Sequence, residues 1–449
     1  MNNLLKPILV VGVILTIFLT VVIQSNTAPN AAQQTKTAIT PRITATLPPP
    51  TKTPYSVPST PAGNRPPACT FPLASLGSQE SAIASPALEN FSFSEPKVAL
   101  SSPYGISLVS WLPDNETLLV KRRQPDSVKE TIETFNTRTG QSQIYAVQDG
   151  SSIPVWLPDL NAVAYTTGVR KSGNSSGVDH YELWVSYGSP EKQRLISADV
   201  SFHSVALLGQ KLMYFSPSAG TRPQIWDSAV ERSQITPIDL EPFVYSKFSQ
   251  APVSVSTFAK SFQIAPHPQG RWSAFYGSAL VFLADSETGQ ICEVDLGTDN
   301  TLPLWAYDLR WSADGRYLTM LVSSGYPGNL IPHNNIVVLD TLTGKPHSID
   351  INTTFVYQTD WLPNSRILSG LINIETLNGH PYMGLVLMDA TEKNVQRILP
   401  EQVFGGGVAN LLAWSTNAGR IAIKCPLWAT TKPLIVEDRI CIVDVTQQR

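Results

Sequence analysis

The sequence carries little charge. Asp, Glu, Lys and Arg make up 15% of its 449 residues, and the formal net charge is −3. The protein therefore has no strong electrostatic field of one sign that would attract nucleic acid. Amphipathic surface helices need a charged face, so the low charge disfavours them. The 27 Gly and 36 Pro instead favour short strands joined by turns. The densest basic run, 121–123, is expected to be a solvated strand end.

Motifs for metal binding are also lacking. The six histidines form no H-x-x-x-H pair, and only His203 and His267 are expected near innermost strands. Their register positions differ by three residues, which places them about 10 Å apart along a channel, too far to share one ion. The sequence predicts no metal site, no cofactor and no catalytic residue.

One long apolar run is present, Pro7 to Ile23, and a single Lys6 precedes it. Its length suits a short membrane span or the core of a signal peptide. The absence of a basic cluster after Ile23 predicts that the rest of the chain lies outside the cytoplasm. We expect residues 1–24 to be a signal anchor, that is, a transmembrane helix. The alternative is a cleaved signal peptide and a secreted protein.

The next stretch is rich in Thr, Pro and Ala and has few large apolar side chains. Such a composition buries too little surface to offset the entropy of ordering the chain. Residues 25–96 are expected to form a disordered stalk and lead-in that holds the folded part away from the bilayer.

A motif then recurs seven times, and its clearest copy is LRWSADGRYLTMLV at Leu309 to Val322. It predicts a strand ending on a Trp, a tight turn at Asp-Gly and a second strand. A second half of each copy predicts two more strands about a polar turn. The copies recur at intervals of about 45 to 61 residues, as propeller blades do. Their anchor positions are Trp111, Trp156, Val205, Pro266, Trp311, Trp361 and Trp414.

We therefore predict an all-β, seven-bladed β-propeller of four-stranded antiparallel blades over residues 97–449. Because Val205 and Pro266 replace the Trp in two copies, a six-bladed ring is the alternative. The seventh copy ends soon after Val445, too early to include an outer strand. Lys97 to Ser102 (KVALSS) is predicted to supply that strand and close the ring.

The W-S-A-D-G-R core at Trp311 to Arg316, followed by V-L-D-T-L-T-G at Val338 to Gly344, resembles the repeats of TolB-type propellers, also called WD-like repeats. The resemblance covers residues 97–449 and implies the propeller fold. It implies no single activity, because such propellers include periplasmic scaffold proteins and the non-catalytic domains of prolyl-oligopeptidase-like enzymes.

Residues that recur at one register are expected to be structural. The anchor tryptophans are predicted to pack between blades. A catalytic acid would be singular, so the acidic residues repeated at one turn position are predicted to serve the turn. They are Asp227, Asp285, Asp340, Asp389 and Asp444.

Two side-chain pairs are singled out. Arg310 and Asp360 each precede the anchor Trp in neighbouring copies, which predicts an ion pair lining the channel. Cys425 and Cys441 fall on adjacent predicted strands, which predicts a disulfide in an oxidising compartment. For Cys69 and Cys292 the spacing leaves the pairing open.

The function expected from these features is non-enzymatic. A propeller anchored outside the cytoplasm would bind a protein or an envelope polymer through its loop face, with residues 241–260 as the first contact surface. The rival is an extracellular hydrolase or lyase that acts on a carbohydrate or lactone at the channel mouth. A purely structural or sensory ectodomain is a third alternative. The oligomeric state is left open.

Overall fold

The computed structural model describes residues 66–71 and 87–447. Within this span, gaps fall at 126, 128, 150–153, 170–179, 202–204, 241–262, 278–279, 296–303, 325–333, 350, 352–355, 364–365, 378–379, 392–394, 400–410 and 429–434. The expected signal anchor, most of the expected stalk, His203 and the expected contact surface 241–260 lie outside the described residues. In the part that is described, no helix is long and apolar enough to span a membrane.

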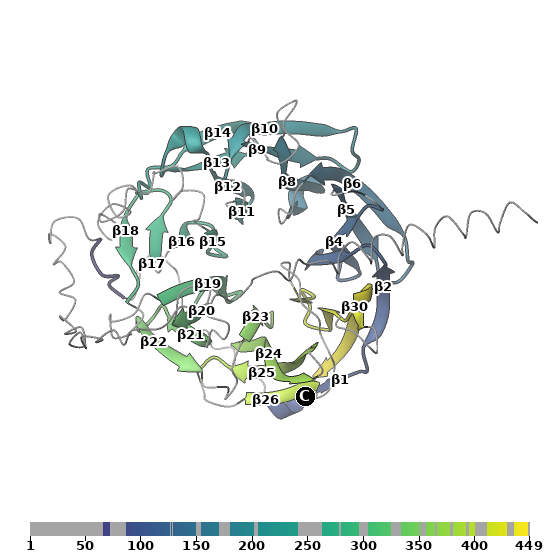
Figure 1. Ribbon diagram of the computed structural model, residues 1–449. Coiled ribbons are helices and arrows are strands. Elements are labelled where there is room, and N and C mark those ends of the chain that lie inside the picture. The colour runs from purple at the N-terminus through teal and green to yellow at the C-terminus, as the bar shows by residue number, and fades with distance from the viewer. Residues whose placement is uncertain are drawn as a thin grey trace, which may run out of the picture. The chain divides into compact units, whose positions relative to one another are not determined.

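Seven sheets are arranged around a central axis (Figure 1). Six of them are four-stranded antiparallel meanders in which strands consecutive in sequence are neighbours. The prediction of seven blades is confirmed, and the six-bladed alternative is wrong, because the copies anchored by Val205 and Pro266 each form a complete sheet.

The strands of the first three blades follow the chain order. They are β3 (Ile106–Trp111), β4 (Thr117–Arg123), β5 (Lys129–Asn136), β6 (Ser142–Asp149), β7 (Val155–Leu157), β8 (Ala162–Val169), β9 (His180–Ser186), β10 (Gln193–Val200), β11 (Val205–Leu208), β12 (Lys211–Phe215), β13 (Pro223–Asp227) and β14 (Arg232–Ile235).

Blades four to six repeat this plan. Their strands are β15 (Gln263–Pro266), β16 (Trp272–Gly277), β17 (Leu280–Asp285), β18 (Ile291–Glu293), β19 (Leu304–Trp311), β20 (Tyr317–Ser324), β21 (Asn334–Asp340), β22 (Lys345–Ile349), β23 (Val356–Trp361), β24 (Ile367–Leu377), β25 (His380–Asp389) and β26 (Val395–Leu399). The described residues also form three short 3-10 turns, η1 (Leu88–Asn90), η2 (Pro158–Leu160) and η3 (Pro217–Ala219).

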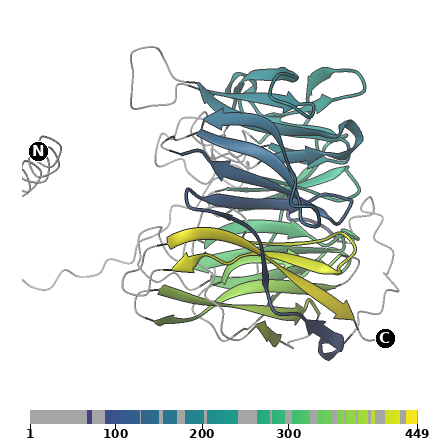
Figure 2. The same cartoon turned by 90° about the vertical axis from the view of Figure 1, so that its right-hand side faces the viewer.

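Blade seven combines the two ends of the described chain. Its inner strands are β27 (Leu412–Trp414) and β28 (Arg420–Lys424), and β30 (Ile435–Gln447) follows, with the short β29 (Leu427–Trp428) at one end. Two earlier strands, β1 (Phe91–Phe93) and β2 (Lys97–Ser102), pair antiparallel with β30. In Figure 2 this dark-blue segment runs across the yellow final strand.

The prediction that Lys97–Ser102 closes the ring is thereby confirmed. Val98 pairs with Cys441, and Ser102 pairs with Asp438. Strand β1 lies before the expected boundary at residue 97 and extends the closing segment along β30.

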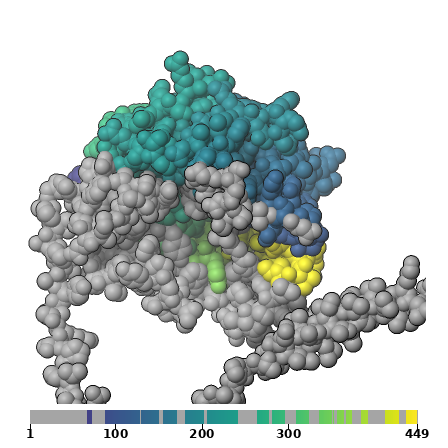
Figure 3. Space-filling model, turned by 45° about the horizontal axis from the view of Figure 1, so that its top comes forward, coloured from purple at the N-terminus to yellow at the C-terminus, as the bar shows by residue number. Residues whose placement is uncertain are grey.

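The anchor tryptophans join neighbouring blades. The indole N–H of Trp111 in blade one donates to the carbonyl of Ala413 in blade seven at 3.0 Å. That of Trp361 in blade six donates to the carbonyl of Arg310 in blade five, also at 3.0 Å. Clusters of buried apolar side chains fill the spaces between successive blades. Figure 3 shows the surface of the first blade, in blue, beside that of the last, in yellow.

The tight turns of the repeat follow from their residues. In blade five the Asp314 carboxylate accepts a hydrogen bond from the Arg316 amide at 3.0 Å, and Gly315 adopts a positive φ of 74°. The following strand β20 is buried on both faces because blades four and six cover it, as the continuous burial of Leu318 to Val322 shows.

Candidate functional site

The innermost strands β19 and β23 of blades five and six lie next to the central axis (Figure 1), and three charged side chains on them interact. We call Asp308, Arg310 and Asp360 the axial cluster. Strand β19 carries a register irregularity between Tyr307 and Arg310, and within it Asp308 adopts a positive φ of 51°. A bulge of this kind redirects a side chain, and here it turns Asp308 toward Arg310.

Arg310 and Asp360 lie close to one another, as predicted, but Asp308 is the nearer partner of Arg310. Arg310 Nε donates to Asp308 Oδ1 at 2.9 Å, whereas Arg310 Nη1 lies 3.8 Å from Asp360 Oδ1. The Arg310 and Asp360 side chains are 27% and 21% exposed, so the group is only partly open to solvent. No sequence pattern pointed to Asp308, because its position depends on the bulge.

One carboxylate oxygen of each aspartate in the axial cluster accepts a hydrogen bond from a backbone amide of the next blade. Asp308 Oδ2 accepts from the Thr359 amide of blade six at 2.8 Å. Asp360 Oδ2 accepts from the Trp414 amide of blade seven at 3.3 Å. The cluster therefore joins the inner strands of three blades.

The surroundings of the cluster shift its ionisation. Burial raises the pKa of Asp360 to about 6, although the nearby Arg310 acts in the opposite direction. Burial acts to lower the pKa of Arg310, but the charges of Asp308 and Asp360 outweigh it and leave that pKa raised. Burial also raises the pKa of the Tyr276 hydroxyl, and the charge of Asp308 adds to the effect.

Gln358 is a second residue that sequence reasoning missed. Its side chain is buried in blade six, where Oε1 accepts from the Leu411 and Leu412 amides and Nε2 donates to the Leu412 carbonyl at 3.0 Å. A single amide side chain thus satisfies backbone groups at the inner edge of blade seven.

His267, one of the two histidines expected near the axis, is 1% exposed. Its Nε2 lies 3.0 Å from the Gly315 carbonyl, and its ring packs edge-on against Trp311 at 4.8 Å between centroids. Burial lowers the pKa of His267. The side chain therefore joins the turns of blades four and five.

Four of the repeated aspartates, Asp227, Asp285, Asp340 and Asp389, end the third strands of their blades at turns, as predicted. The prediction is wrong for Asp444, which lies within the long strand β30. In blade four Asp285 Oδ1 accepts from the Glu287 amide, and Asp285 Oδ2 accepts from Arg271 at 2.6 Å. The same cation-to-aspartate pair recurs in other blades, as Lys211 with Asp227, Arg316 with Asp340, Arg366 with Asp389 and Arg420 with Asp444. The first four of these carboxylates stabilise turns, and Asp444 pairs across to the start of β28.

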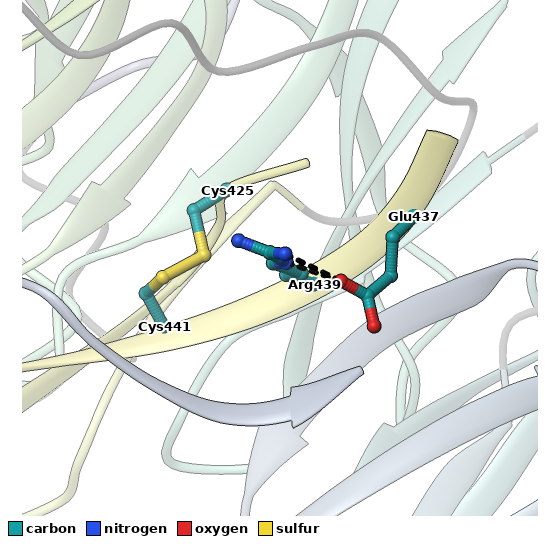
Figure 4. The surroundings of a disulfide bond; sticks show 4 residues. All are labelled: Cys425, Glu437, Arg439 and Cys441. Atoms are coloured by element: carbon teal, nitrogen blue, oxygen red, sulfur yellow. Dashed lines mark hydrogen bonds and ion pairs between the residues drawn. A yellow bond between two sulfur atoms is a disulfide. The ribbon is translucent and has the colours of Figure 1, made fainter. Parts of the chain in front are cut away.

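All four cysteines are paired. Cys425 and Cys441 form a disulfide within blade seven, and Cys69 and Cys292 form one that joins the lead-in to blade four. Figure 4 shows the first of these beside the ion pair of Arg439 and Glu437. A hydrogen bond from Arg439 lowers the pKa of Glu437, and a hydrogen bond with Ser101 lowers it further.

Where side chains are described, no group of three or more His, Cys, Asp and Glu residues is placed to hold a metal ion. The stretch GNSSG at 173–177 has the G-x-S-x-G spacing of a nucleophile elbow, but it lies outside the described residues. It connects β8 and β9, which pair antiparallel as a hairpin. A nucleophile elbow instead connects a strand to a helix.

No protein-family model matches the chain, and no curated protein matches it. Solved structures that resemble it include an oligogalacturonate lyase in complex with manganese, at 9% identity and a TM-score of 0.49, covering 79% of this chain and 96% of that one. An oligogalacturonate lyase from Vibrio parahaemolyticus matches at 10% identity and a TM-score of 0.48, covering 79% and 97%.

TolB from Acinetobacter baumannii matches at 12% identity and a TM-score of 0.36, covering 73% of this chain and 79% of that one. Likenesses this distant identify neither an activity nor a partner. The strand pairing itself identifies the chain as a seven-bladed β-propeller.

Proposed function

We propose that the protein is a membrane-tethered, extracytoplasmic scaffold that binds a protein or an envelope polymer through one face of the propeller. The observation that carries this proposal is a difference in the length of the connections on the two faces. Connections between first and second strands, such as Trp111 to Thr117, are short in each blade. On the opposite face Ile235 is followed by β15 only at Gln263, and Leu399 by β27 only at Leu412.

Long connections on a rigid framework are the usual carriers of recognition. The framework here is held by seams in which side chains of one blade bond to the backbone of the next, as Gln358 and Asp308 do. The carboxylates of the axial cluster are engaged in these seams, which favours a structural role for them over catalysis.

The disulfides support the proposed compartment. Disulfides persist in oxidising surroundings and are rare in the cytosol. An uncleaved apolar run at residues 1–24 would tether the propeller to the cell membrane, whereas cleavage would give a secreted protein. Amino-terminal sequencing of the mature protein, together with extraction of membranes at alkaline pH, separates the two outcomes.

Affinity capture from solubilised membranes tests the binding proposal. The full-length protein should retain a defined partner, and replacing residues 241–260 by a short Gly/Ser linker should abolish that retention. A matched control replaces the turn of residues 228–231 between β13 and β14 of blade three, which lies on the opposite face. Retention of the same partner by the 241–260 variant would contradict the proposed contact surface.

One observation favours the rival enzymatic function. Asp360 has a pKa of about 6 beside Arg310 near the axis, which is a suitable value for a general acid. If the protein cleaves a carbohydrate or lactone, turnover of a screened set of glycans and esters should be lost in Asp360→Asn. Turnover by the wild type that this variant lacks would establish the enzyme and displace the binding proposal.

A further inference from the structure

The chain that precedes blade one is attached to the ring at separate places. Its first described residues lie beside β18 of blade four. The Cys69 amide donates to the Glu293 carbonyl at 3.0 Å, and the Glu293 amide donates to the Pro67 carbonyl at 2.9 Å. The disulfide between Cys69 and Cys292 adds a covalent bond at the same place.

Further attachments follow along the chain. Phe71 packs against Gly344 in the turn between β21 and β22 of blade five, so closely that a Cβ on Gly344 would lie 2.1 Å from the Phe71 ring. Leu88 and Phe91 are buried in the apolar cluster that blades six and seven share. We call residues 66–71 and 87–102 the belt, since they contact blades four to seven.

The closing part of the belt is held without covalent bonds. Strands β1 and β2 run antiparallel to β30, with Phe91 opposite Gln447 and Ser102 opposite Asp438. A pull from the amino-terminal side would reach Phe91 first and separate the pairs one after another. Each backbone hydrogen bond contributes only about 1 kcal/mol net, so bonds that are loaded singly open easily.

We propose that the Cys69–Cys292 disulfide is a tension-bearing clip. A load that arrives from residues before 66 passes through this bond into blade four, so that β1 and β2, which close the ring, stay unloaded. The Cys425–Cys441 disulfide cannot serve this purpose, because both of its cysteines belong to blade seven. The inference rests on the tethering part of the proposed function, since an untethered propeller would carry no such load.

Pulling single molecules in optical tweezers tests the clip. The full-length protein in detergent carries one handle on a tag inserted after residue 58. The second handle is on a tag in the turn of residues 228–231, where Val230 is 56% exposed. In Cys69→Ser/Cys292→Ser the lead-in through β2 should detach first, in an early step of about 100 Å at roughly 3.4 Å per residue.

The wild type should lack this early step and should open only at a force at least twofold higher. The matched control, Cys425→Ser/Cys441→Ser, keeps the clip and should also lack the step. If the serine variant of the clip does not fold, the same comparison is made on folded wild-type molecules before and after a phosphine reductant is added at low force.

An early step of the same length in the oxidised wild type would overturn the proposal. Its absence after removal or reduction of the Cys69–Cys292 bond would do so as well. Because the handles apply the load directly, failure of the clip would leave the outcome of the affinity capture unaffected.

Discussion

Blade five and blade seven carry the same repeat but are completed in different ways. The four strands of blade five follow one another from Leu304 to Ile349. Blade seven obtains β1 and β2 from the opposite end of the described chain. Blade five therefore forms from local contacts, whereas blade seven requires a pairing with a large loop-closure entropy.

The two blades also differ in how they are reinforced. In blade five the turn at Gly315 packs against His267 of blade four. Blade seven instead has a disulfide, Cys425–Cys441, that links the end of β28 to β30. The comparison indicates that the continuous blade depends on tight packing at its turn, whereas the composite blade depends on its added strands and its crosslink.

Removing the added strands should have the largest effect. Deletion of residues 68–104 exposes the apolar clusters that Leu88, Phe91 and Leu100 help to fill. It should cost several kcal/mol, a large part of a typical stability of ~5–15 kcal/mol. Thermal unfolding measures the loss, and an unchanged melting temperature would refute the closure of blade seven by the belt.

Point variants in the same strand provide a matched test. Leu100 is 8% exposed and Val98 is 53% exposed. Leu100→Ala should therefore lose about 2–4 kcal/mol, and Val98→Ala close to none.

Disturbing the turn of blade five should have the next largest effect. In Gly315→Ala the new Cβ would lie 2.0 Å from His267 Nε2, and the backbone has a positive φ. The expected loss is about 3 kcal/mol in denaturant unfolding. Gly140 has nearly the same φ but open space around it, so Gly140→Ala should lose only about 1 kcal/mol. Equal losses in the two variants would show that the contact with His267 is unimportant.

The contribution of the axial cluster to the free energy of unfolding should depend on pH. Because the pKa of Asp360 is raised to about 6 in the folded protein, the folded state binds this proton more tightly than the unfolded state. The contribution of Asp360 to stability is present below about pH 4 and is lost as pH rises through about 6.

The stability of Asp360→Asn relative to the wild type should therefore increase by up to about 3 kcal/mol between pH 4 and pH 7. For Asp227, hydrogen bonding to Lys211 lowers the pKa, so Asp227→Asn should change in the opposite direction. Urea unfolding at several pH values measures both differences. A constant difference for Asp360→Asn would show that this carboxyl has an ordinary pKa.

Removing the cation-to-aspartate pairs of blades five and seven should have the smallest effect on stability and gives the finest comparison of the two blades. Asp340 in blade five is 14% exposed and pairs with Arg316, which also lies over the Tyr317 ring. Asp444 in blade seven is 52% exposed and pairs with Arg420. Arg316→Gln should cost about 1 kcal/mol and Arg420→Gln less than about 0.5 kcal/mol in chemical unfolding. The reverse order would contradict the greater burial of the blade-five pair.

Much of the fold could be predicted because the repeat is local. Strand, turn and strand are adjacent in sequence, so the Asp-Gly turn and the recurring Trp indicated blades and their number. Closure by Lys97–Ser102 was predictable from the missing outer strand of the last copy. The belt before residue 97 was not, because its contacts with blades four to six join residues far apart in the chain.

Less of the candidate site could be predicted. Arg310 and Asp360 were placed at one level because they share a register in neighbouring copies. Asp308 was missed because a bulge turns it toward Arg310, and a register argument assumes a regular strand. Gln358 was missed because its partners are backbone groups, which carry no sequence signal.

The sequence by itself determined the all-β repeat architecture, because six of the seven blades are built from strands adjacent in sequence and joined by local turns. Only the tertiary structure decided that Cys69 pairs with Cys292 across 223 residues and that Asp308 joins blades five and six. Both contacts depend on how the blades and the lead-in pack in space, which brings distant segments together at positions that no local spacing encodes.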